Sequence, residues 1–197
     1  MTPSIFAAVL AAGRSSRFGS TKQLADIDGS PMVRRAVRTA TRVCGAHALL
    51  VTGHDRTAVA LACAGLPGFV TVNEDYQRGL GSSIAHAIRV LPSQSSAILV
   101  MLADQPLIGE GHLQAIVAGW SGANDEIVAT SYAGTRGTPV LFPRACFAEL
   151  ATLDGDRGAR HLIEDDRYKV SVIGCEGAAL DVDTPADLTQ ISRSARS

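Results

Sequence analysis

The residues best suited to chemistry in this chain follow its first apolar segment. Residues 5–12 are wholly apolar and lead into Gly13, after which Arg14, Arg17 and Lys22 follow within ten positions. Small residues let backbone N–H groups approach a polyanion, and the three cations can neutralise it. The loop lacks the Gly-Lys-Ser/Thr ending of a P-loop and the three-glycine spacing of a dinucleotide fingerprint. We interpret it as a phosphate-binding loop of another kind; the alternative is a turn with solvated charges.

Carboxylates follow two other apolar segments. Asp104 comes directly after residues 97–103, and Asp181 and Asp183 alternate in a short segment near the C-terminus. A carboxylate at the tip of a buried strand is a natural ligand for a hard cation. If Asp104 and Asp183 meet, they can hold one Mg²⁺ while nucleotide phosphates fill its remaining positions. The alternative is that Asp104 caps the following turn and Asp183 caps the last helix.

A third segment joins glycines to hydroxyl groups. Within residues 73–83, Gly79 and Gly81 permit close approach of the backbone, and Ser82 and Ser83 begin a helix. Free N–H groups and hydroxyls at such a turn can bind a base edge or a ribose. A helix capped by serine explains the same residues structurally.

Two further segments pair glycine with arginine. Residues 134–139 enter a predicted strand, and residues 155–160 enter a predicted helix. Glycine next to arginine suits an anionic second substrate, although a turn with a solvated arginine accounts for either segment alone. We find no Ser-His-Asp or Cys-His arrangement. Cations and a carboxylate-held metal are what phosphoryl and nucleotidyl transfer need, because these reactions depend on positioning and charge neutralisation.

The elements that must position these residues alternate between strand-like and helix-like patterns. Hydrophobic residues make up 46% of the 197 residues and aromatic residues only 5%, which suits helices packed on a parallel sheet. The predicted fold is α/β, with three α/β/α layers and a mostly parallel mixed sheet over residues 1–197 as one domain. Predicted strands cover 4–11, 47–53, 69–73, 96–103, 126–132, 138–142, 168–174 and 179–182. Predicted helices cover 31–44, 55–64, 80–91, 109–120, 143–151, 157–165 and 184–193.

Local signals refine this pattern. Asp55 can cap the second helix, and Thr184-Pro185 supplies a cap and a first-turn proline for the last one. The two strands around Ala133-Gly134 suggest that one member of the sheet runs antiparallel. Ligands of such sheets bind beyond the carboxyl ends of the strands, so the polar segments described above should converge there.

Composition limits the classes of partner. The net charge of −1 argues against a general nucleic-acid or membrane surface, and no apolar segment approaches the roughly 20 residues that span a bilayer. The arginines follow the first apolar segment, which is the wrong charge order for a secretion signal. The four cysteines lie far apart, so we expect free thiols in a reducing cytoplasm.

Taken together, these segments resemble the molybdenum cofactor nucleotidyltransferases, and among them the cytidylyltransferases, over nearly the whole chain. The opening motif alone is shared with many sugar-nucleotide and cytidylyl transferases; the middle and late motifs narrow the resemblance. The motifs are Leu10-Ala11-Ala12-Gly13-x-Ser15-x-Arg17-x-Gly19 with Lys22, Asn73-x-x-Tyr76-x-x-Gly79-Leu80-Gly81-Ser82-Ser83, Leu102-Ala103-Asp104-Gln105-Pro106, Gly137-x-Pro139-Val140, Gly155-Asp156-x-Gly158-Ala159-Arg160 and Asp181-x-Asp183-Thr184-Pro185.

The resemblance implies a Rossmann-like nucleotidyltransferase fold and a role for each matching residue. Arg17, Lys22 and Asp104 would be catalytic, and Asp104 and Asp183 would bind Mg²⁺. Nucleotide-binding residues would be Leu10, Ala11, Ala12, Gly13, Arg14, Ser15, Arg17, Lys22, Gly79, Leu80, Gly81, Ser82, Ser83 and Asp104. Acceptor-binding residues would be Gln105, Arg136, Gly137, Thr138, Asp156 and Arg160.

The implied reaction is attack by the terminal phosphate of molybdopterin, or of the molybdenum cofactor, on the α-phosphorus of CTP. Guanylyl-transferring relatives tend to carry Leu-Ala-Gly-Gly where this chain has Leu-Ala-Ala-Gly, so Ala12 favours cytosine. Relatives often have histidine where this chain has Thr138, which leaves the acceptor open. The resemblance also implies a transient encounter with a recipient molybdoenzyme.

Two other readings stay open. One is a guanylyl- or cytidylyltransferase for another phosphorylated acceptor. The other is a carrier that holds the molybdenum cofactor without turnover, although a carrier has no need to neutralise a leaving pyrophosphate with Lys22, Asp104 and Asp183.

Overall fold

The apolar run near the N-terminus forms β1 (Ile5–Ala11), the strand around which the molecule is built. Its lack of polar side chains is explained by burial on both faces: Ala7 and Val9 pack into one core and Ala8 and Leu10 into another. The computed structural model describes residues 4–16 and 18–194.

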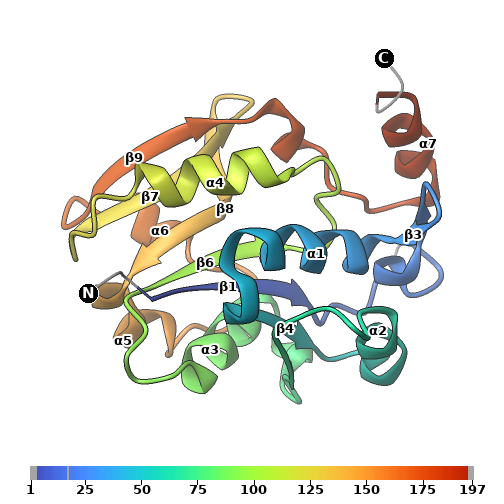
Figure 1. The fold of residues 1–197 in the computed structure, drawn as a ribbon, viewed down its shortest axis with the longest axis horizontal. Helices are drawn as coiled ribbons and strands as arrows, with labels where there is room; N and C mark the ends of the chain where they lie inside the picture. Colours follow the sequence, from blue (N-terminus) through green and yellow to red (C-terminus); the bar gives the residue numbers. More distant parts are fainter. Residues whose placement is uncertain (1–3, 17, 195–197) are drawn as a thin grey trace.

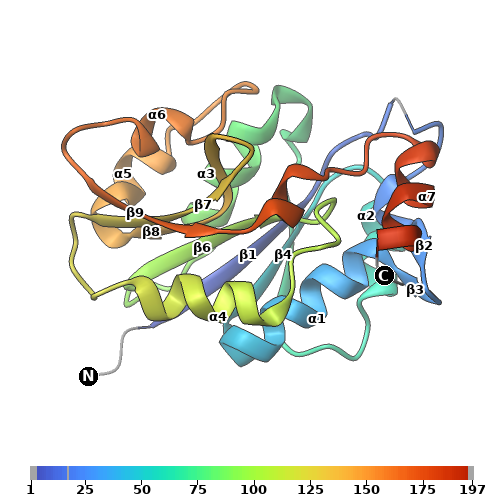
Figure 2. The same ribbon diagram turned by 90° about the horizontal axis from the view of Figure 1, so that it is seen from above.

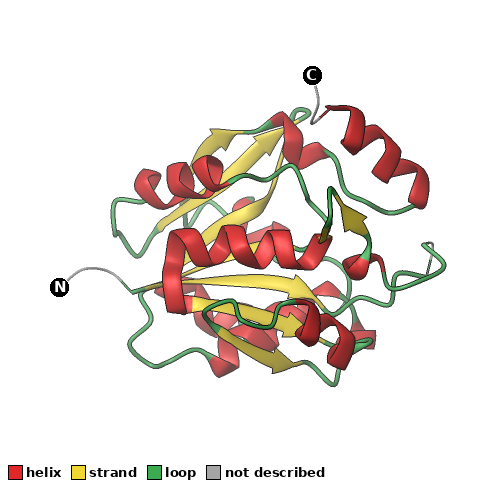
Figure 3. Ribbon diagram, turned by 45° about the vertical axis from the view of Figure 1, so that its right-hand side comes forward, coloured by secondary structure: helices red, strands yellow, loops and turns green. Residues whose placement is uncertain are grey.

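The strands form one seven-stranded mixed sheet in the order β5-β4-β1-β6-β8-β7-β9, which Figure 3 shows in yellow between the helices. All neighbours pair in parallel except those of β8, which runs antiparallel to both β6 and β7. The predicted mostly parallel sheet and its antiparallel member are therefore confirmed. The remaining strands of the sheet are β4 (Ala48–Thr52), β5 (Phe69–Val72), β6 (Ala97–Leu102), β7 (Glu126–Tyr132), β8 (Thr135–Pro143) and β9 (Lys169–Gly174).

Helices cover both faces of the sheet and give the three predicted layers. Helices α1, α2 and α4 bury their apolar side chains against one face, and α3, α5 and α6 against the other. Figure 1 shows α1 and α4 in front of the sheet, and Figure 2 shows α3, α5 and α6 on its opposite side. Their bounds are α1 (Met32–Cys44), α2 (Arg56–Ala62), α3 (Leu80–Val90), α4 (Glu110–Gly119), α5 (Phe147–Leu150) and α6 (Arg160–Ile163).

A third, smaller core lies at one end of the molecule beneath the last helix, α7 (Pro185–Ser194). Ile27, Met32, Val182 and Ile191 are its buried members, so it ties the C-terminal helix to the start of α1. Figure 2 shows α7 beside the short strands β2 (Asp26–Ile27) and β3 (Ser30–Pro31). This core holds the C-terminal segment against the region that follows the first loop.

The β2–β3 hairpin is absent from the sequence prediction, although the chain carries its signal. Asp28 and Gly29 both have positive φ, of 52° and 79°, as a tight hairpin turn requires. The Asp26 carboxylate accepts a hydrogen bond from the Gly29 N–H. An Asp-Gly pair is a strong local hairpin signal, and the two-residue strands are simply too short to show alternation.

The predicted strand over 179–182 is wrong. The chain there forms a 3-10 helix over Glu176–Ala179 and then an irregular segment. Its alternating Asp-Val-Asp pattern imitates a strand, but the cause is different: Val182 is buried in the third core while its N–H bonds the carbonyl of Asp104. No ladder of hydrogen bonds to a neighbouring described strand forms.

Two helices differ from the prediction in length or structure. The helix expected at 157–165 is reduced to α6, because Gly158 has a φ of +55° and lies outside the helix. The segment expected to be helical at 143–151 begins as a 3-10 helix over Arg144–Cys146 and continues as α5. Shorter 3-10 helices also occur at Lys22–Leu24, Gly45–His47 and Tyr76–Arg78.

The predicted capping interactions divide between the two helices. Asp55 stands at the N-cap of α2 but makes no side-chain capping hydrogen bond, and its carboxylate instead accepts one from the hydroxyl of Thr21. At α7 the predicted first-turn position of Pro185 is confirmed. The Thr184 side chain does not act as the predicted cap acceptor: its hydroxyl donates to the Asp187 carboxylate, which also accepts the Thr184 N–H. None of the helices among the described residues is long and apolar enough to cross a membrane. The four cysteines are free thiols, as expected.

Gly81 and Gly111 offer a matched test of the packing at α3. Each is the second residue of a helix, but a Cβ on Gly81 would lie 2.9 Å from backbone atoms of Asp154, whereas a Cβ on Gly111 would meet nothing within 4 Å. We expect Gly81→Ala to lower the free energy of unfolding by about 1–3 kcal/mol, or roughly 2–10 °C in Tm, because the backbone must shift.

Gly111→Ala is the control, and it should leave Tm unchanged or raise it slightly, because alanine favours a helix more than glycine does. Thermal unfolding of both variants by circular dichroism makes the comparison. Equal Tm values for the two variants would contradict the close approach of residue 154 to α3.

Candidate functional site

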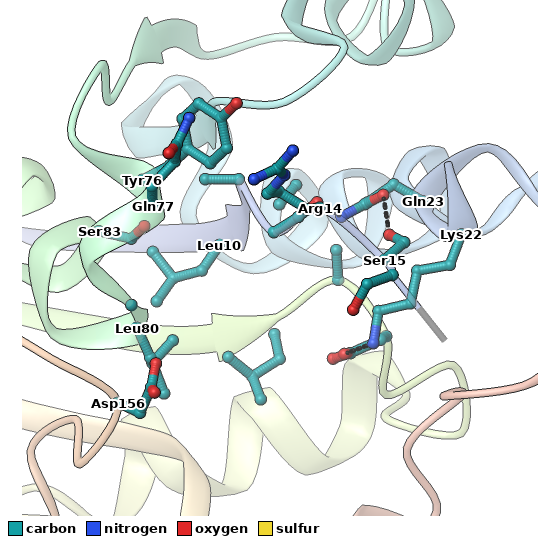
Figure 4. A pocket seen from close by; sticks show the side chains of 18 of the residues that line it. Leu10, Arg14, Ser15, Lys22, Gln23, Tyr76, Gln77, Leu80, Ser83 and Asp156 are labelled. Carbon is teal, nitrogen blue, oxygen red and sulfur yellow. Dashed lines mark hydrogen bonds and ion pairs between the residues drawn. The ribbon is translucent and has the colours of Figure 1, made fainter. Parts of the chain in front are cut away.

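A cavity of about 430 Å³ opens at the carboxyl ends of β1 and β6, where the sequence predicts that the polar segments converge. Its walls come from the loop after β1, the turn before α3, the end of β6 and the segment before α7. Figure 4 shows these side chains around the opening. The lining residues are Leu10, Ala11, Ala12, Gly13, Arg14, Ser15, Ser16, Lys22, Gln23, Tyr76, Gln77, Gly79, Leu80, Ser83, Leu102, Ala103, Asp104, Asp156 and Asp183.

An ammonium group joins two carboxylates at one side of this cavity. The Nζ atom of Lys22 lies 2.6 Å from Oδ2 of Asp104 and 3.1 Å from Oδ1 of Asp183. Burial of Lys22 lowers its pKa, but the charges and hydrogen bonds of the two carboxylates outweigh that effect and hold the pKa above its ordinary value. The lysine is therefore a permanent cation between the carboxylates.

The second oxygen of Asp104 shows that this group can take another partner. Its Oδ1 atom is buried and accepts no hydrogen bond from any described residue. Since Oδ2 of Asp104 bonds Lys22 and Oδ1 bonds no described residue, Asp104 does not cap the following turn. The Asp183 carboxylate also contacts Lys22. A buried carboxylate oxygen with no donor is costly unless a cation or a donor reaches it, so the oxygen-rich pair fits a hard divalent cation.

The Asp183 backbone is held from both sides. Val182 donates its N–H to the carbonyl of Asp104 at 2.9 Å. On the other side, Oδ2 of Asp187 accepts the N–H groups of Asp183 and Thr184 at 3.0 and 2.7 Å. These bonds, with Val182 buried in the third core, bring Asp183 beside Asp104 across about eighty residues of sequence.

The loop after β1 is held open by a buried glutamine that the sequence prediction omits. Gln23 is 3% exposed; its amide donates to the carbonyl of Gly13 at 2.9 Å and accepts from the hydroxyl of Ser15 at 3.0 Å. A Cβ on Gly13 would reach only Gln23, at 4.0 Å, so the protein leaves room beside this backbone. That room is suited to a polyanion approaching the N–H groups.

The turn before α3 contributes Gly79, Leu80 and Ser83 to the cavity. Gly79 has a φ of +99°, and a Cβ there would lie 2.3 Å from Oδ1 of Asp156, so only glycine fits. Ser82 and Ser83 do not cap the helix as the structural alternative proposed. The Ser82 hydroxyl instead donates to backbone carbonyls of the same turn, and both serines accept hydrogen bonds from Asn73.

A second cavity of about 270 Å³ lies next to the first and shares Leu80 with it. Its floor is apolar, formed by side chains such as Ile84, Val100 and Phe142. Three guanidinium groups stand among its lining residues. The lining residues with polar or glycine character are Tyr132, Arg136, Gly137, Thr138, Arg157, Gly158 and Arg160.

The predicted acceptor-binding residues therefore do not all lie in one cavity. Arg136, Gly137, Thr138 and Arg160 line the second cavity, while Asp156 lines the first. Gln105 lines neither: it is 3% exposed and donates to the carbonyl of Ala178 at 3.0 Å.

Among the predicted nucleotide-binding residues, Gly81 and Ser82 lie away from the first cavity. Gly81 donates its N–H to the carbonyl of Gly155 at 2.8 Å and packs on that loop, and Ser82 is 5% exposed. Arg17 lies outside the described residues. Every other predicted nucleotide residue lines the first cavity, and Asp183 lies there too.

The cavity also contains residues that the sequence prediction did not select. Tyr76 and Gln77 lie inside the motif that begins at Asn73 and that contains the predicted residues Gly79 and Leu80, so their position in that motif was a usable signal. Gln23 directly follows Lys22 and is polar in a segment that packs against the core. Ser16, Leu102 and Ala103 each lie within two positions of a predicted site residue, Ser15 or Asp104.

Asp181 lies close enough to the carboxylate pair for their charges to interact. Desolvation by the surrounding protein and the negative charge of Asp104 raise the pKa of Asp181 to about 6, against a smaller opposing effect of a hydrogen bond from Gln105. The residue keeps an exposed surface, so solvent screens part of this effect. Asp181 gains a proton more readily than an ordinary aspartate does.

The chain is similar in sequence to a known protein family and to individual proteins. Residues 7–171 match the family described as the MobA-like NTP transferase domain. The chain is 29% identical to the purine catabolism protein PucB of Bacillus subtilis, over 98% of both chains. It is 26% identical to the molybdenum cofactor cytidylyltransferase of Escherichia coli, over 91% of both.

Two solved structures of one mycobacterial protein are similar to this chain in fold and in sequence. The crystal structure of Rv0371c from Mycobacterium tuberculosis superposes with a TM-score of 0.84 at 32% identity, covering 98% of this chain and 99% of that one. A complex of Rv0371c with manganese superposes with a TM-score of 0.81 at 31% identity, covering 97% and 99%.

The raised pKa of Asp181 gives a prediction with a definite sign. Between pH 4 and about 6 the folded chain binds more protons at Asp181 than the unfolded chain does, so its contribution to stability falls as pH rises through this window. Asp181→Asn has no proton to release, so this variant does not lose that contribution to stability as the pH rises. We expect its Tm to exceed that of the parent at pH 7 by about 2–4 °C, equivalent to about 1 kcal/mol after allowance for screening.

Thermal unfolding of both proteins at pH 5, 6, 7 and 8 measures the difference. The gap in Tm should narrow towards pH 5 and become constant above pH 7. A gap that is equal at all four pH values would mean that titration of Asp181 contributes nothing.

Proposed function

The chain belongs to the family of MobA-like NTP transferase domains and is a nucleotidyltransferase, and from this membership we propose that it transfers CMP from CTP to the terminal phosphate of molybdopterin or of the molybdenum cofactor. An oxygen of that phosphate attacks the α-phosphorus of CTP. The bond from the α-phosphorus to the oxygen that bridges it to the β-phosphorus breaks, and pyrophosphate leaves. The product is the cytosine dinucleotide form of the cofactor.

The observation that carries the transfer chemistry is the ion cluster of Lys22, Asp104 and Asp183 at the wall of the first cavity. Transfer of a nucleotidyl group needs neutralisation of charge on the phosphates more than it needs a strong base. Lys22 is a permanent cation, and Arg14 lines the same cavity. We assign the phosphates of the nucleotide to this side, with Arg17 as a further cation of the same loop.

A divalent cation belongs to the same proposal. Asp104 and Asp183 would hold it, because their oxygens are close together and Oδ1 of Asp104 lacks a donor. When bound, Mg²⁺ would polarise the phosphates and neutralise the charge of the departing pyrophosphate. The manganese complex of the similar protein Rv0371c supports the choice of a divalent cation.

Cytosine is supported by Ala12 and by the similarity to the Escherichia coli cytidylyltransferase. Ala12 is 4% exposed and lines the first cavity, so its methyl group takes space that glycine would leave open. One methyl group discriminates by about 1–3 kcal/mol.

The acceptor is assigned to the second cavity. An apolar floor suits a flat heterocycle, and the guanidinium groups of Arg136 and Arg160 suit its phosphate. The cavities meet at Leu80, so two ligands bound there would lie side by side. Proximity of this kind is a large part of the catalysis of bimolecular reactions.

Another phosphorylated acceptor is the second candidate. Thr138 lines the second cavity at the position where relatives often carry histidine, so this wall differs from theirs. A different acceptor would leave the assignment of the nucleotide unchanged.

Nucleotide binding and turnover test the main proposal. We expect CTP with Mg²⁺ to raise Tm more than GTP, ATP or UTP; at a hundred times Kd the gain is about 2.7 kcal/mol, or roughly 5–10 °C. Pyrophosphate release should then require both CTP and molybdopterin. Asp104→Ala should reduce kcat/KM at least about a hundredfold, because transition-state charge loses its partner.

Each result has a distinct meaning. A larger shift with GTP would replace cytosine by guanine. Binding of molybdopterin without pyrophosphate release under any nucleotide would favour a carrier. An Asp104→Ala variant with full activity would overturn the role of the carboxylate pair.

The second cavity makes a separate prediction. Arg136→Ala and Arg160→Ala should each raise KM for the acceptor about tenfold, while KM for CTP changes less than about twofold, because the loss is confined to phosphate binding. Arg38→Ala is the matched control, since Arg38 is exposed on α1 and lines neither cavity. Steady-state kinetics with one substrate varied at a time separates the two KM values. Equal effects on both would place these arginines outside the acceptor site.

A further inference from the structure

Asn73 is a buried polar residue that lines neither of the two cavities but contacts Ser83, which lines the first one. It follows β5 and is 2% exposed. Its Nδ2 atom donates to the hydroxyl oxygens of Ser82 and Ser83 at 3.0 and 3.1 Å. A buried amide that donates its two N–H groups to two neighbouring hydroxyl oxygens fixes the direction in which each hydroxyl can donate its own proton.

The orientation of this amide is fixed by the backbone. The N–H of Asp75 donates to Oδ1 of Asn73 at 3.1 Å. Because an N–H group needs an acceptor, the oxygen must face Asp75, and the NH₂ group must face the serines. Turning the amide over would set its NH₂ group against the Asp75 N–H and lose that hydrogen bond.

The two serines then differ in one respect. Ser82 gives its own proton to the carbonyls of Asp75 and Gly79, at 3.0 and 2.8 Å. Ser83 finds no acceptor for its proton among the described residues. Ser83 is nevertheless only 4% exposed, and it lines the first cavity.

The position of Ser83 in the first cavity indicates which part of a bound nucleotide its hydroxyl proton would face. Figure 4 shows Ser83 on the same side of the cavity as Tyr76, Gln77 and Leu80, while Lys22 stands on the opposite side. The phosphates are assigned to the side of Lys22, so the base of a nucleotide would lie towards Ser83. The Ser83 hydroxyl accepts a hydrogen bond from Asn73 and keeps its proton for a ligand, which it therefore meets as a hydrogen-bond donor.

Resting on the function proposed above, we propose that Asn73 is a positioning residue for base recognition: by donating to Ser83, it aims the Ser83 proton at an acceptor atom of the bound base. Cytosine offers two acceptors, N3 and O2, on the edge where guanine offers mainly donors. Asn73 acts through Ser83 and touches no ligand itself.

Asn73→Asp is the sharpest test, because it changes polarity and hardly changes shape. A carboxylate cannot donate, so the Ser83 proton turns towards it and away from the cavity. We expect Kd for CTP to rise about tenfold, the effect of one hydrogen bond. Kd for inorganic triphosphate, which has no base, should change less than about twofold. Isothermal titration calorimetry with Mg²⁺ gives both values.

Companion variants separate positioning from folding. Ser83→Ala should reproduce the loss for CTP, and the double variant Asn73→Asp/Ser83→Ala should lose no more than either single variant, because both remove the same hydrogen bond. Ser82→Ala is the matched control: it loses one hydrogen bond to Asn73, so Tm should fall, but the ratio of the two Kd values should stay near that of the parent.

If Asn73→Asp does not fold, Asn73→Ala replaces it, with a smaller rise in Kd for CTP expected because the Ser83 hydroxyl is then free to rotate. Equal weakening of CTP and triphosphate in the Asn73 variant would overturn the inference, as would additive losses in the double variant.

Failure of the proposed function gives a different result. A parent protein that binds GTP more tightly than CTP overturns the choice of cytosine alone, and the same variants then test Asn73 with GTP against triphosphate. A parent that binds triphosphate and every nucleotide equally overturns recognition of the base by Ser83. A parent that binds none of these ligands overturns both proposals.

Discussion

Three distant parts of the chain meet through one ammonium group. Lys22 comes from the loop after β1, Asp104 from the end of β6 and Asp183 from the segment before α7, and Nζ lies 2.6 and 3.1 Å from the two carboxylates. The side chains of Lys22 and Asp104 are only 14% and 21% exposed. Removing charges from water to this degree costs about as much as their attraction returns. The cluster therefore adds little net stability, and its main effect is to hold the two carboxylates and the loop that carries Lys22 in fixed positions.

The sheet makes this meeting possible. β1 lies between β4 and β6 and is parallel to both, so their carboxyl ends face the same edge. Small side chains such as Ala7, Ala8 and Ala97 are fully buried in these strands and let the helices pack closely on both faces. A rigid base of this kind allows the loops above it to place polar groups accurately, as in other open α/β sheets.

The two cavities extend the same arrangement. Leu80 lines both, and the loop that carries Asp156 in the first cavity carries Arg157 and Arg160 in the second. Close contacts at Gly79 and Gly81 hold this loop against the start of α3, so the same packing forms part of the walls of both cavities. A transferase needs its two substrates adjacent, and the packing of one loop on one helix is what joins the two sites.

The sequence by itself determined the alternation of strands and helices, the three layers and the antiparallel member of the sheet. It also determined most of the first cavity, because an apolar strand followed by small or charged residues is a local pattern with a known place in such sheets. It did not determine the segment at 179–182, where burial of Val182 imitates strand alternation, or the places of Gln105, Gly81 and Ser82. Gln105 and Gly81 lie away from the cavity because folding brings them partners distant in the chain, the carbonyls of Ala178 and Gly155. Only tertiary structure decides whether a polar side chain finds its partner in the protein or is left to a ligand, because that depends on atoms far away in the chain.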